Sequence, residues 1–262
     1  MQLTNVVDAN RKSLKSVESF IDNSDYHKSP DNYGLPQSVY HLIDQPIGDQ
    51  ITYVDLIMFL QTFFTTKRVK YVEIGVSVLK TFYQVSNFLK ESDLYAFDIN
   101  KINPTIEKRY VSRSKSNQIN CYEYNSNNIS YFQGDVFNKQ DFDKFKEHIN
   151  SKANIIFSDA HHSGGGLESE YNWYIRDALA DEFILYYDDL ENPEMRDVFI
   201  KIFKDIKTKN HNVSAALLKV NGWLGQHEYA HSNGIITSLD LKTIMRDNKV
   251  DIPLTFLEMR KE

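Results

Sequence analysis

The chain has 262 residues, of which 41% are hydrophobic and 25% are charged, and its formal net charge is −6. These values are typical of a globular protein, and the acidic balance argues against a broad nucleic-acid-binding surface. The only cysteine, Cys121, excludes an intramolecular disulfide framework. The first residues lack an apolar core of signal-peptide length, and no stretch approaches the roughly 18 apolar residues of a membrane span. We therefore expect a cytoplasmic protein that does not enter the membrane.

The N-terminal part of the chain differs from the rest. Residues 1–50 lack strong hydrophobic periodicity, and the segment 24–48 contains three prolines and two glycines, which is typical of a loop-rich region. We interpret residues 1–50 as an extension that covers a site or makes an oligomer contact. No internal repeat or linker divides residues 51–262, so we expect a single domain there.

Helical and extended patterns alternate along this domain. We predict helices at residues 52–66, 78–90, 139–149, 167–179 and 193–207, and strands at 69–74, 94–98, 129–133, 153–158, 183–187, 213–220 and 229–239. The polar segment 100–127 is interpreted as a ragged helix and a loop. Alternation of this kind predicts an α/β, Rossmann-like fold with helices on both faces of a mainly parallel seven-stranded sheet, whose last two strands form an antiparallel hairpin.

Acidic residues follow the predicted strands in succession. These residues are Glu73, Asp98, Asp135, Asp159, and the pair Asp188 and Asp189. A single one could be a helix cap or a turn residue. Ligands of open α/β sheets bind at the carboxyl ends of the strands, so a series of carboxylates there favours a ligand with hydroxyls or a cationic group. The dinucleotide fingerprint G-x-G-x-x-G and the phosphate loop G-x-x-x-x-G-K-[ST] are both absent, which argues against NAD and ATP.

Three short segments carry a more specific signal. The segments YVEIGVS at 71–77, AFDIN at 96–100 and QGDVF at 133–137 resemble the cofactor-binding segments of class I S-adenosylmethionine (SAM) dependent methyltransferases. The resemblance covers about residues 52–240. It implies that SAM is the cofactor and assigns it the following residues: Glu73, Gly75 and Ser77 at the first turn, Asp98 and Ile99 near the ribose, and Asp135 and Val136 near the adenine.

The first turn departs from the family pattern. The family has glycines at three alternating positions, whereas this chain has only the first, Gly75, with Ser77 and Leu79 at the other two. Glycine permits a close backbone approach that larger residues restrict. The absence of the second and third glycines leaves open whether the protein is catalytically active. The fold prediction is unaffected, because it rests on the whole series of strands.

A second group of residues indicates metal chemistry. Asp159, Asp188 and Asp189 follow neighbouring predicted strands, and three carboxylates can surround a hard cation such as Mg²⁺. A nearby histidine could remove a proton from a hydroxyl group at neutral pH. The simpler interpretation is that these aspartates cap helices and that His161 or His162 is a loop residue.

This second group also resembles a known pattern. It is similar to the metal-dependent O-methyltransferases of the catechol and the macrocin or mycinamicin types, and to the cephalosporin hydroxylase-like group. The resemblance implies that Asp159, Asp188 and Asp189 bind the metal, and that His162, three residues beyond Asp159, is the catalytic base.

Other residues near these segments have two interpretations each. Gly164, Gly165 and Gly166 could form a mobile loop that leaves room for an acceptor, or an ordinary surface loop. Tyr171, Trp173 and Tyr174 could stack on an acceptor, although core packing is the more common role of such residues. The predicted hairpin turn holds Trp223, His227 and Glu228, and could border the acceptor pocket.

These observations favour a SAM-dependent, Mg²⁺-assisted O-methyltransferase that acts on a hydroxyl of a small molecule, such as a sugar or a natural product. One alternative is a metal-independent methyltransferase of protein or RNA. Another is a catalytically silent binding protein with the same fold. We expect no nucleic-acid partner. Enzymes of this kind often form homo-oligomers, and the sequence leaves the assembly of this chain open.

Overall fold

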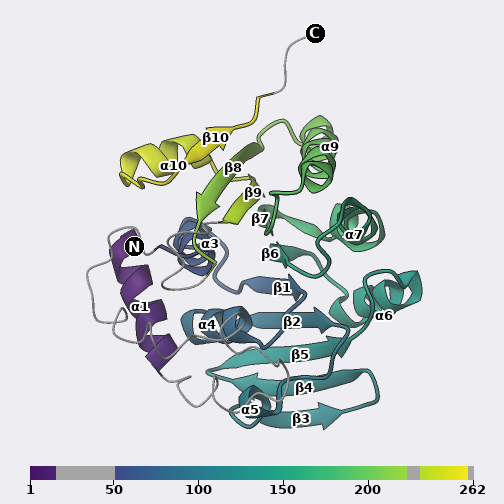
Figure 1. Cartoon of the computed structure of the whole chain (residues 1–262). Coiled ribbons are helices and arrows are strands. Elements are labelled where there is room, and N and C mark those ends of the chain that lie inside the picture. The colour runs from purple at the N-terminus through teal and green to yellow at the C-terminus, as the bar shows by residue number, and fades with distance from the viewer. Residues whose placement is uncertain (16–50, 223–230, 259–262) are drawn as a thin grey trace.

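The computed structural model describes residues 1–15, 51–222 and 231–258, and one sheet of ten strands forms its centre (Figure 1). The strands are β1 (Lys70–Ile74), β2 (Asp93–Asp98), β3 (Val111–Lys115), β4 (Ile119–Tyr124), β5 (Asn127–Gln133), β6 (Ala153–Ser158), β7 (Leu179–Tyr187), β8 (Ser214–Val220), β9 (His231–Thr237) and β10 (Leu254–Phe256). They lie in the order β10-β8-β9-β7-β6-β1-β2-β5-β4-β3.

The sheet is mixed, with a parallel centre. Strands β5, β2, β1, β6 and β7 pair in parallel. Strand β9 pairs antiparallel with β7, and β8 pairs antiparallel with β9, as the predicted hairpin requires. The α/β fold is therefore confirmed, but the prediction of a mainly parallel seven-stranded sheet is wrong, because β3, β4 and β10 extend it to ten strands.

The extra strands escaped prediction for a physical reason. Strands β3 and β4 lie in the segment 100–127, which we expected to be helix and loop. Every residue of β3 is exposed, and β4 has a single buried residue, Tyr122. With little buried surface, these strands lack the clear apolar alternation by which a strand is recognised. They join the sheet through antiparallel pairing of β3 with β4 and of β4 with β5.

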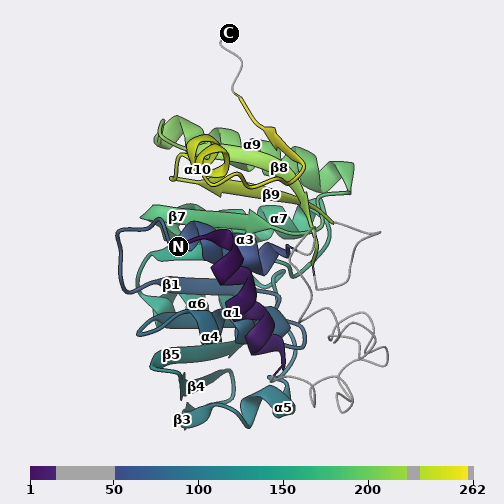
Figure 2. The ribbon, with the colours of Figure 1, turned by 90° about the vertical axis from the view of Figure 1, so that its left-hand side faces the viewer.

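Helices cover both faces of the sheet, as predicted (Figures 1 and 2). One layer contains α1 (Leu3–Lys15), α3 (Tyr53–Gln61), α4 (Lys80–Phe88) and α10 (Leu241–Asp247). The other contains α6 (Lys139–Ile149), α7 (Gly164–Glu170) and α9 (Pro193–Lys209). Two shorter helices are α5 (Pro104–Glu107) and α8 (Arg176–Ala178), and α7 continues into α8 through a π-helical turn, η3 (Tyr171–Ile175). None of the described helices is long and apolar enough to cross a membrane.

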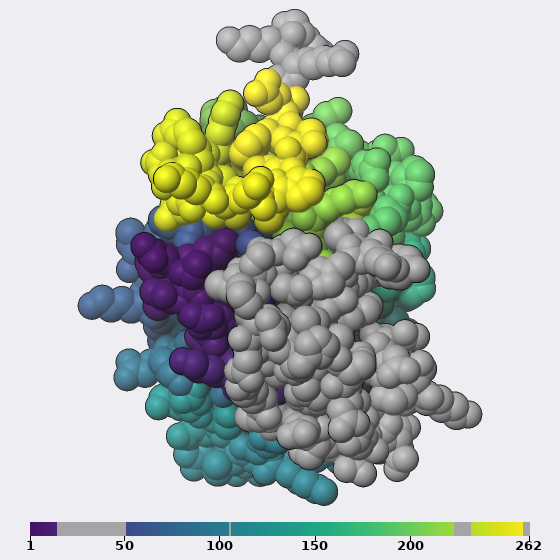
Figure 3. Space-filling view, turned by 60° about the vertical axis from the view of Figure 1, so that its left-hand side comes forward, coloured from purple at the N-terminus to yellow at the C-terminus, as the bar shows by residue number. Residues whose placement is uncertain are grey.

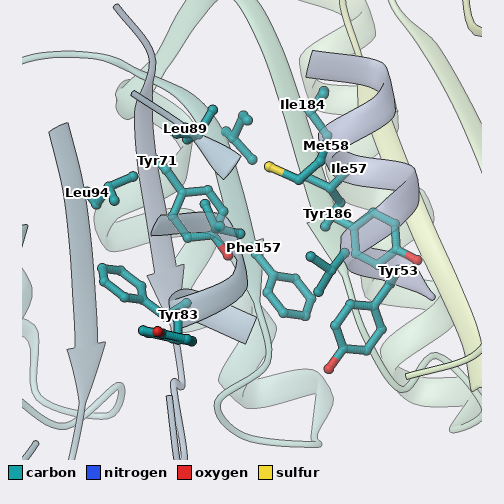
Figure 4. Close-up of a cluster of buried hydrophobic side chains, with 14 of the residues drawn as sticks. Tyr53, Ile57, Met58, Tyr71, Tyr83, Leu89, Leu94, Phe157, Ile184 and Tyr186 are labelled. Atoms are coloured by element: carbon teal, nitrogen blue, oxygen red, sulfur yellow. The ribbon is translucent and has the colours of Figure 1, made fainter. Parts of the chain in front are cut away.

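The two layers enclose separate hydrophobic cores. Strand β1 alternates between them, because Tyr71 faces the α3 and α4 side while Val72 and Ile74 face the α6 and α9 side. Figure 4 shows the first core, in which Tyr53 of α3 packs 5.0 Å from the ring of Phe157 in β6.

Helix α1 lies on the outside of the first layer (purple in Figures 2 and 3). Asn10 of α1 donates a hydrogen bond of 2.7 Å to Asp55 of α3, and both side chains are buried. Asp55 also completes a capping box with Thr52 at the start of α3. The part of the predicted extension that the structure describes is therefore packed on the domain, and residues 16–50 lie outside the described residues.

Candidate active site

The predicted acidic residues meet along one edge of the sheet. The parallel strands are in register, with Ile74 of β1 opposite Phe97 of β2 and Ser158 of β6. Backbone hydrogen bonds continue past the strand ends: Gly75 N donates to Phe97 O over 2.8 Å, and Asp159 N donates to Ile74 O over 2.8 Å. The loops that follow the strands are therefore held side by side.

Two cavities open along this edge. The first, of about 310 Å³, is called the acidic cavity here. It is lined by Tyr53, Glu73, Gly75, Val76, Ser77, Val78, Lys80, Thr81, Asp159, His162, Asp188, Asp189 and Gly222. The second, of about 480 Å³, is called the apolar cavity. It is lined by Gly75, Ser77, Phe97, Asp98, Ile99, Asn100, Gly134, Asp135, Val136, Phe137, Asp159, Ala160, His161 and His162.

The first turn has the backbone of a glycine-rich turn without its later glycines. Gly75, Ser77 and Leu79 all have positive φ, at 84°, 44° and 67°. Such angles favour glycine and cost other residues on the order of 1–2 kcal/mol each. Asp98 holds this turn, because its Oδ2 accepts hydrogen bonds from Val76 N at 2.9 Å and Ser77 N at 3.0 Å. The alternating left-handed conformation is therefore kept although the sequence departs from the glycine pattern.

Gly75 is the position of closest approach. A Cβ added there would lie 2.3 Å from the carbonyl oxygen of Asp159 and 2.4 Å from Cα of Ala160. Both of these are backbone atoms of the loop after β6, so neither can move aside as the end of a side chain would. The missing side chain lets the loops after β1 and β6 touch, and this contact forms the shared wall of the two cavities.

Exposed apolar side chains flank the apolar cavity. Ile99 is 61% exposed and Phe137 is 49% exposed, and they follow the acidic residues Asp98 and Asp135. Val136, the other predicted apolar contact, is only 8% exposed. Phe137 was not predicted as a site residue, although its place two residues after Asp135 could have indicated it. A planar apolar group bound between Ile99 and Phe137 would remove this exposed area from water.

The acidic cavity contains a compact group of ligand-type atoms. Asp159, His162 and Asp189 each offer an atom within 4.8 Å of the others. The Nε2 of His162 lies 3.4 Å from Oδ1 of Asp159, and its Nδ1 lies 3.0 Å from Oδ2 of Asp189. Asp188, the third predicted ligand, is buried and lines the same cavity but is not a member of this group.

The two aspartates strongly affect His162. Hydrogen bonds to Asp159 and Asp189 raise the pKa of His162 to about 10, against the effect of burial. Burial raises the pKa of Asp159, while the hydrogen bond to His162 lowers it. The imidazole is consequently protonated at neutral pH in this arrangement. It can accept a proton only when the negative charge of the two aspartates is neutralised.

Other buried polar groups surround this cluster. Glu73 lies in the acidic cavity, accepts a hydrogen bond of 2.5 Å from the Tyr71 hydroxyl, and has a pKa raised by burial. Lys80 and Tyr53, which were not predicted, also line the cavity. Tyr53 comes from α3 and Lys80 from α4. No sequence motif marks either residue, because the packing of both helices against the sheet brings them there.

Glu170 contacts the end of β6, the strand that Asp159 follows. This residue of α7 is fully buried, and its Oε2 accepts a hydrogen bond of 2.5 Å from Ser158, the last residue of β6. Burial raises the pKa of Glu170 to about 8 from 4.5. In the folded protein this carboxyl is therefore neutral at pH 7, whereas it ionises above about pH 4.5 in the unfolded chain.

The buried carboxyl predicts a pH-dependent stability. Between pH 4.5 and about pH 8 only the unfolded chain loses the proton of Glu170, so its contribution to the free energy of unfolding falls as the pH rises. At roughly 1.4 kcal/mol per pH unit, the loss amounts to about 3–5 kcal/mol. Glu170→Gln should keep the contact with Ser158, so it should be more stable than the wild type at pH 8 and about equal at pH 4.5. Urea unfolding at both values measures this.

A matched variant controls for other groups that titrate in this range. Glu168→Gln removes an exposed carboxylate from the same helix, and its stability should follow that of the wild type at both pH values. If Glu170→Gln also follows the wild type at pH 8, the carboxyl of Glu170 is not neutral in the folded protein.

The residues with two interpretations have definite places. Gly164, Gly165 and Gly166 form the first turn of α7, so both loop interpretations are wrong. The hydroxyl of Ser163 caps this helix by accepting from Gly166 N over 3.1 Å. Tyr171 and Tyr174 are buried, and Trp173 packs against the same core, so core packing is confirmed for all three. Trp223, His227 and Glu228 lie outside the described residues.

No family model matches the chain, and no curated protein matches it. Solved structures do resemble it. The O-methyltransferase from Bacillus cereus, solved with S-adenosylhomocysteine (SAH), is 12% identical, with 87% of this chain and 89% of that chain covered and a TM-score of 0.49.

Two further structures show the range of this resemblance. The mycinamycin-pathway methyltransferase MycE, solved with Mg, SAH and mycinamycin VI, is 11% identical, with 71% of this chain and 48% of that chain covered and a TM-score of 0.40. Spermidine synthase from Thermotoga maritima is 10% identical, with 73% of this chain and 60% of that chain covered and a TM-score of 0.41. At these values the comparison does not assign an activity, and the residues of the site carry the functional argument.

Proposed function

We propose that the protein is a SAM-dependent O-methyltransferase that acts on a hydroxyl group of a small molecule with the help of a divalent cation. The observation that carries this proposal is the meeting of the two cavities. Gly75, Ser77, Asp159 and His162 line both. If the adenosine part of SAM lies in the apolar cavity, its sulfonium can therefore point toward the acidic cavity, where the acceptor would be activated.

The apolar cavity has the chemistry that a nucleoside needs. Ile99 and Phe137 offer apolar surface to a base, and Asp98 and Asp135 offer carboxylate oxygens to hydroxyl and amino groups. Oδ2 of Asp98 already holds the first turn, and Oδ1 of Asp98 accepts a hydrogen bond from Asn100 N over 2.8 Å. Because Oδ2 already accepts two hydrogen bonds and Oδ1 accepts one, Oδ1 keeps the capacity to accept a hydrogen bond from a ribose hydroxyl.

The donor set of the acidic cavity fits a divalent cation. Carboxylate oxygens from Asp159 and Asp189 are the ligands that Mg²⁺ prefers, and Asp188 lies in the same cavity. A bound cation would stabilise the negative charge that develops on the acceptor oxygen as its proton leaves. His162 is the candidate to accept that proton at Nε2 or Nδ1 once the two aspartates no longer hold it in the charged form.

A calorimetric titration tests the cofactor part of the proposal. SAM and SAH are titrated into the protein, once with Mg²⁺ and once with EDTA. We expect binding of both in roughly the micromolar range, since typical substrate affinities of enzymes begin there. Binding should persist in EDTA, because the residues proposed to hold the nucleoside, namely Ile99, Phe137, Asp98 and Asp135, are not among the proposed metal ligands. If neither compound binds under either condition, the proposal is wrong.

A methyl-transfer assay and the charge of the acidic cavity bear on the alternatives. A silent binding protein would bind SAM and SAH but would not transfer the methyl group of SAM to any hydroxyl acceptor in the presence of Mg²⁺. A metal-independent enzyme that modifies RNA requires a cationic acceptor surface for the phosphates. Glu73, Asp159, Asp188 and Asp189 make the acidic cavity unsuitable for such a polyanion.

A further inference from the structure

A buried carboxyl group contacts the end of β6. Glu170, the last residue of α7, is fully buried, and its Oε2 accepts a hydrogen bond of 2.5 Å from the hydroxyl of Ser158. Its Oε1 is also buried and has no hydrogen-bond partner among the described residues. Burying a polar atom without a partner is costly, and an apolar side chain of similar size would avoid this cost. The contact with Ser158 therefore requires an explanation other than stability.

Ser158 lies at the junction of the two loops that carry the acidic residues. It is the last residue of β6 and directly precedes Asp159. Its carbonyl oxygen accepts a hydrogen bond of 3.1 Å from the backbone N of Asp188, which follows β7. Its hydroxyl donates to Glu170 and makes no other hydrogen bond among the described residues. Ser158 thus contacts the loop after β7 through its backbone and α7 through its side chain.

The hydrogen bond between Ser158 and Glu170 closes a loop around part of the site. Residues 159–163 connect β6 with α7, and they contain Asp159 and His162 of the acidic cavity. Because Glu170 belongs to the helix that this segment enters, its hydrogen bond ties that helix back to the residue at which the segment starts. The two ends of the segment are therefore fixed relative to each other.

The end of α7 is itself held in place. The helix continues into the π-helical turn Tyr171–Ile175, and Tyr174 of this turn is buried in the core on the α6 and α9 side. The Tyr171 hydroxyl donates a hydrogen bond of 2.5 Å to Asp205 of α9. A π turn is rare in proteins and is frequently found at functional sites. Glu170 directly precedes this turn, so its carboxyl group meets β6 from an anchored position.

The protonation of Glu170 suits such a contact. Burial raises the pKa of Glu170 to about 8, against the effect of the hydrogen bond from Ser158. The negative charge of Asp159 also raises this pKa, and the charge of His162 lowers it. A neutral carboxyl group holds Ser158 without placing a second negative charge near Asp159. Glutamine offers the same neutral acceptor at a similar size, whereas leucine offers none.

We propose that Glu170 is a positioning residue of the acidic cavity, which fixes the segment 159–163 through Ser158 and so holds the Asp159 carboxylate ready to bind a divalent cation. This inference rests on the proposed function. The partners that orient a metal ligand typically change the metal affinity 10- to 100-fold. The hydrogen bond leaves Oε1 of Glu170 buried and unpaired, and in return it determines where a ligand atom lies.

Titration of Mg²⁺ into the protein saturated with SAH tests this role. The variants are Ser158→Ala, Glu170→Leu, the double variant that combines the two, and Glu170→Gln. We expect the first three to weaken Mg²⁺ binding by about 10-fold or more, as for loss of a partner that orients a metal ligand. Glu170→Gln should bind Mg²⁺ within about 3-fold of the wild type, because its amide oxygen can still accept from Ser158.

Urea unfolding at pH 7 separates positioning from stability. The double variant replaces both partners of the hydrogen bond by apolar groups, so it should be at least as stable as the wild type although it binds Mg²⁺ weakly. Titration of SAH in EDTA checks that each variant keeps the cofactor cavity, and Ser158→Ala, which removes a single hydroxyl, replaces the double variant if that one does not fold. Glu168→Leu makes the same substitution at an exposed position of α7 and should bind Mg²⁺ as the wild type does.

Each contrary result has a distinct meaning. If the double variant binds Mg²⁺ as tightly as the wild type, Glu170 does not position Asp159, and the inference is wrong while the proposed function stands. A Glu170→Gln protein that binds Mg²⁺ as weakly as Glu170→Leu would also overturn it, because a neutral acceptor would then not be sufficient. If the wild type binds SAH but no Mg²⁺, the cation part of the proposed function fails together with the inference. If the wild type does not bind SAH, the proposed function itself fails.

Discussion

Replacing Gly75 by alanine is expected to destabilise the fold by about 3–5 kcal/mol and to abolish SAH binding, since it combines overpacking with a strained backbone. The new Cβ would lie 2.3 Å from the carbonyl oxygen of Asp159 and 2.4 Å from Cα of Ala160, and φ of Gly75 is +84°. The loops after β1 and β6 would have to separate, which opens the wall that the two cavities share. Urea unfolding and SAH titration measure the two effects.

A second glycine provides the control. Gly165 lies in the first turn of α7, and a Cβ added there meets nothing within 4 Å. Gly165→Ala should leave SAH binding unchanged and raise the free energy of unfolding by roughly 0.5–1 kcal/mol, because alanine loses less backbone freedom than glycine on folding. A Gly75→Ala protein that is as stable as the wild type and binds SAH normally would show that the loops do not need this close approach.

Replacing Asp159 by alanine is expected to reduce Mg²⁺ binding and metal-dependent methyl transfer by at least about 100-fold, because the loss of even an outer partner of a metal site costs 10- to 100-fold. Asp159 also makes the largest contribution to the raised pKa of His162. In the variant that pKa should fall below about 10, since only Asp189 remains to stabilise the imidazolium. Calorimetry measures the metal, and NMR titration of the histidine measures the pKa.

The fold of this variant should remain intact. Burial raises the pKa of Asp159, so the folded protein gains little from its charge and should tolerate its removal. Asp181→Ala, at an exposed position at the start of β7, is the control and should change neither metal binding nor the histidine. Normal Mg²⁺ binding by Asp159→Ala would remove Asp159 from the set of metal ligands.

Much of the site could be predicted because its residues directly follow buried strands. The runs of apolar residues that end at Ile74, Phe97 and Phe157 are recognisable in the sequence, and the rule that parallel strands end at one edge places the residues that follow them together. Gly75, Asp98, Asp135 and Asp159 were located in this way, and all four line the cavities. Their roles in binding SAM or a metal stay predictions.

The remaining features depend on contacts between segments that are distant in the chain. The positive φ of Ser77 and Leu79 has no local signal, because neither residue type favours it, and the hydrogen bonds of Asp98 hold the turn in place. The position of His162 between Asp159 and Asp189 requires the pairing of β6 with β7. His162, predicted as the catalytic base, lies 3.4 Å from Asp159 and 3.0 Å from Asp189 in the folded protein, and its role stays a prediction.

The sequence by itself determined the α/β class, the edge of the sheet at which the two cavities open and eleven of the 23 residues that line them, because hydrophobic periodicity and strand-end polarity are local properties of the chain. The tertiary structure decided the size of the sheet, since β3 and β4 belong to a largely polar segment and become strands through pairing of β3 with β4 and of β4 with β5. It also decided the charge of the acidic cavity. Lys80, Glu170 and Tyr53 reach the site from helices, and the low polarity around a buried group, which sets its pKa, exists only after those helices have packed against the sheet.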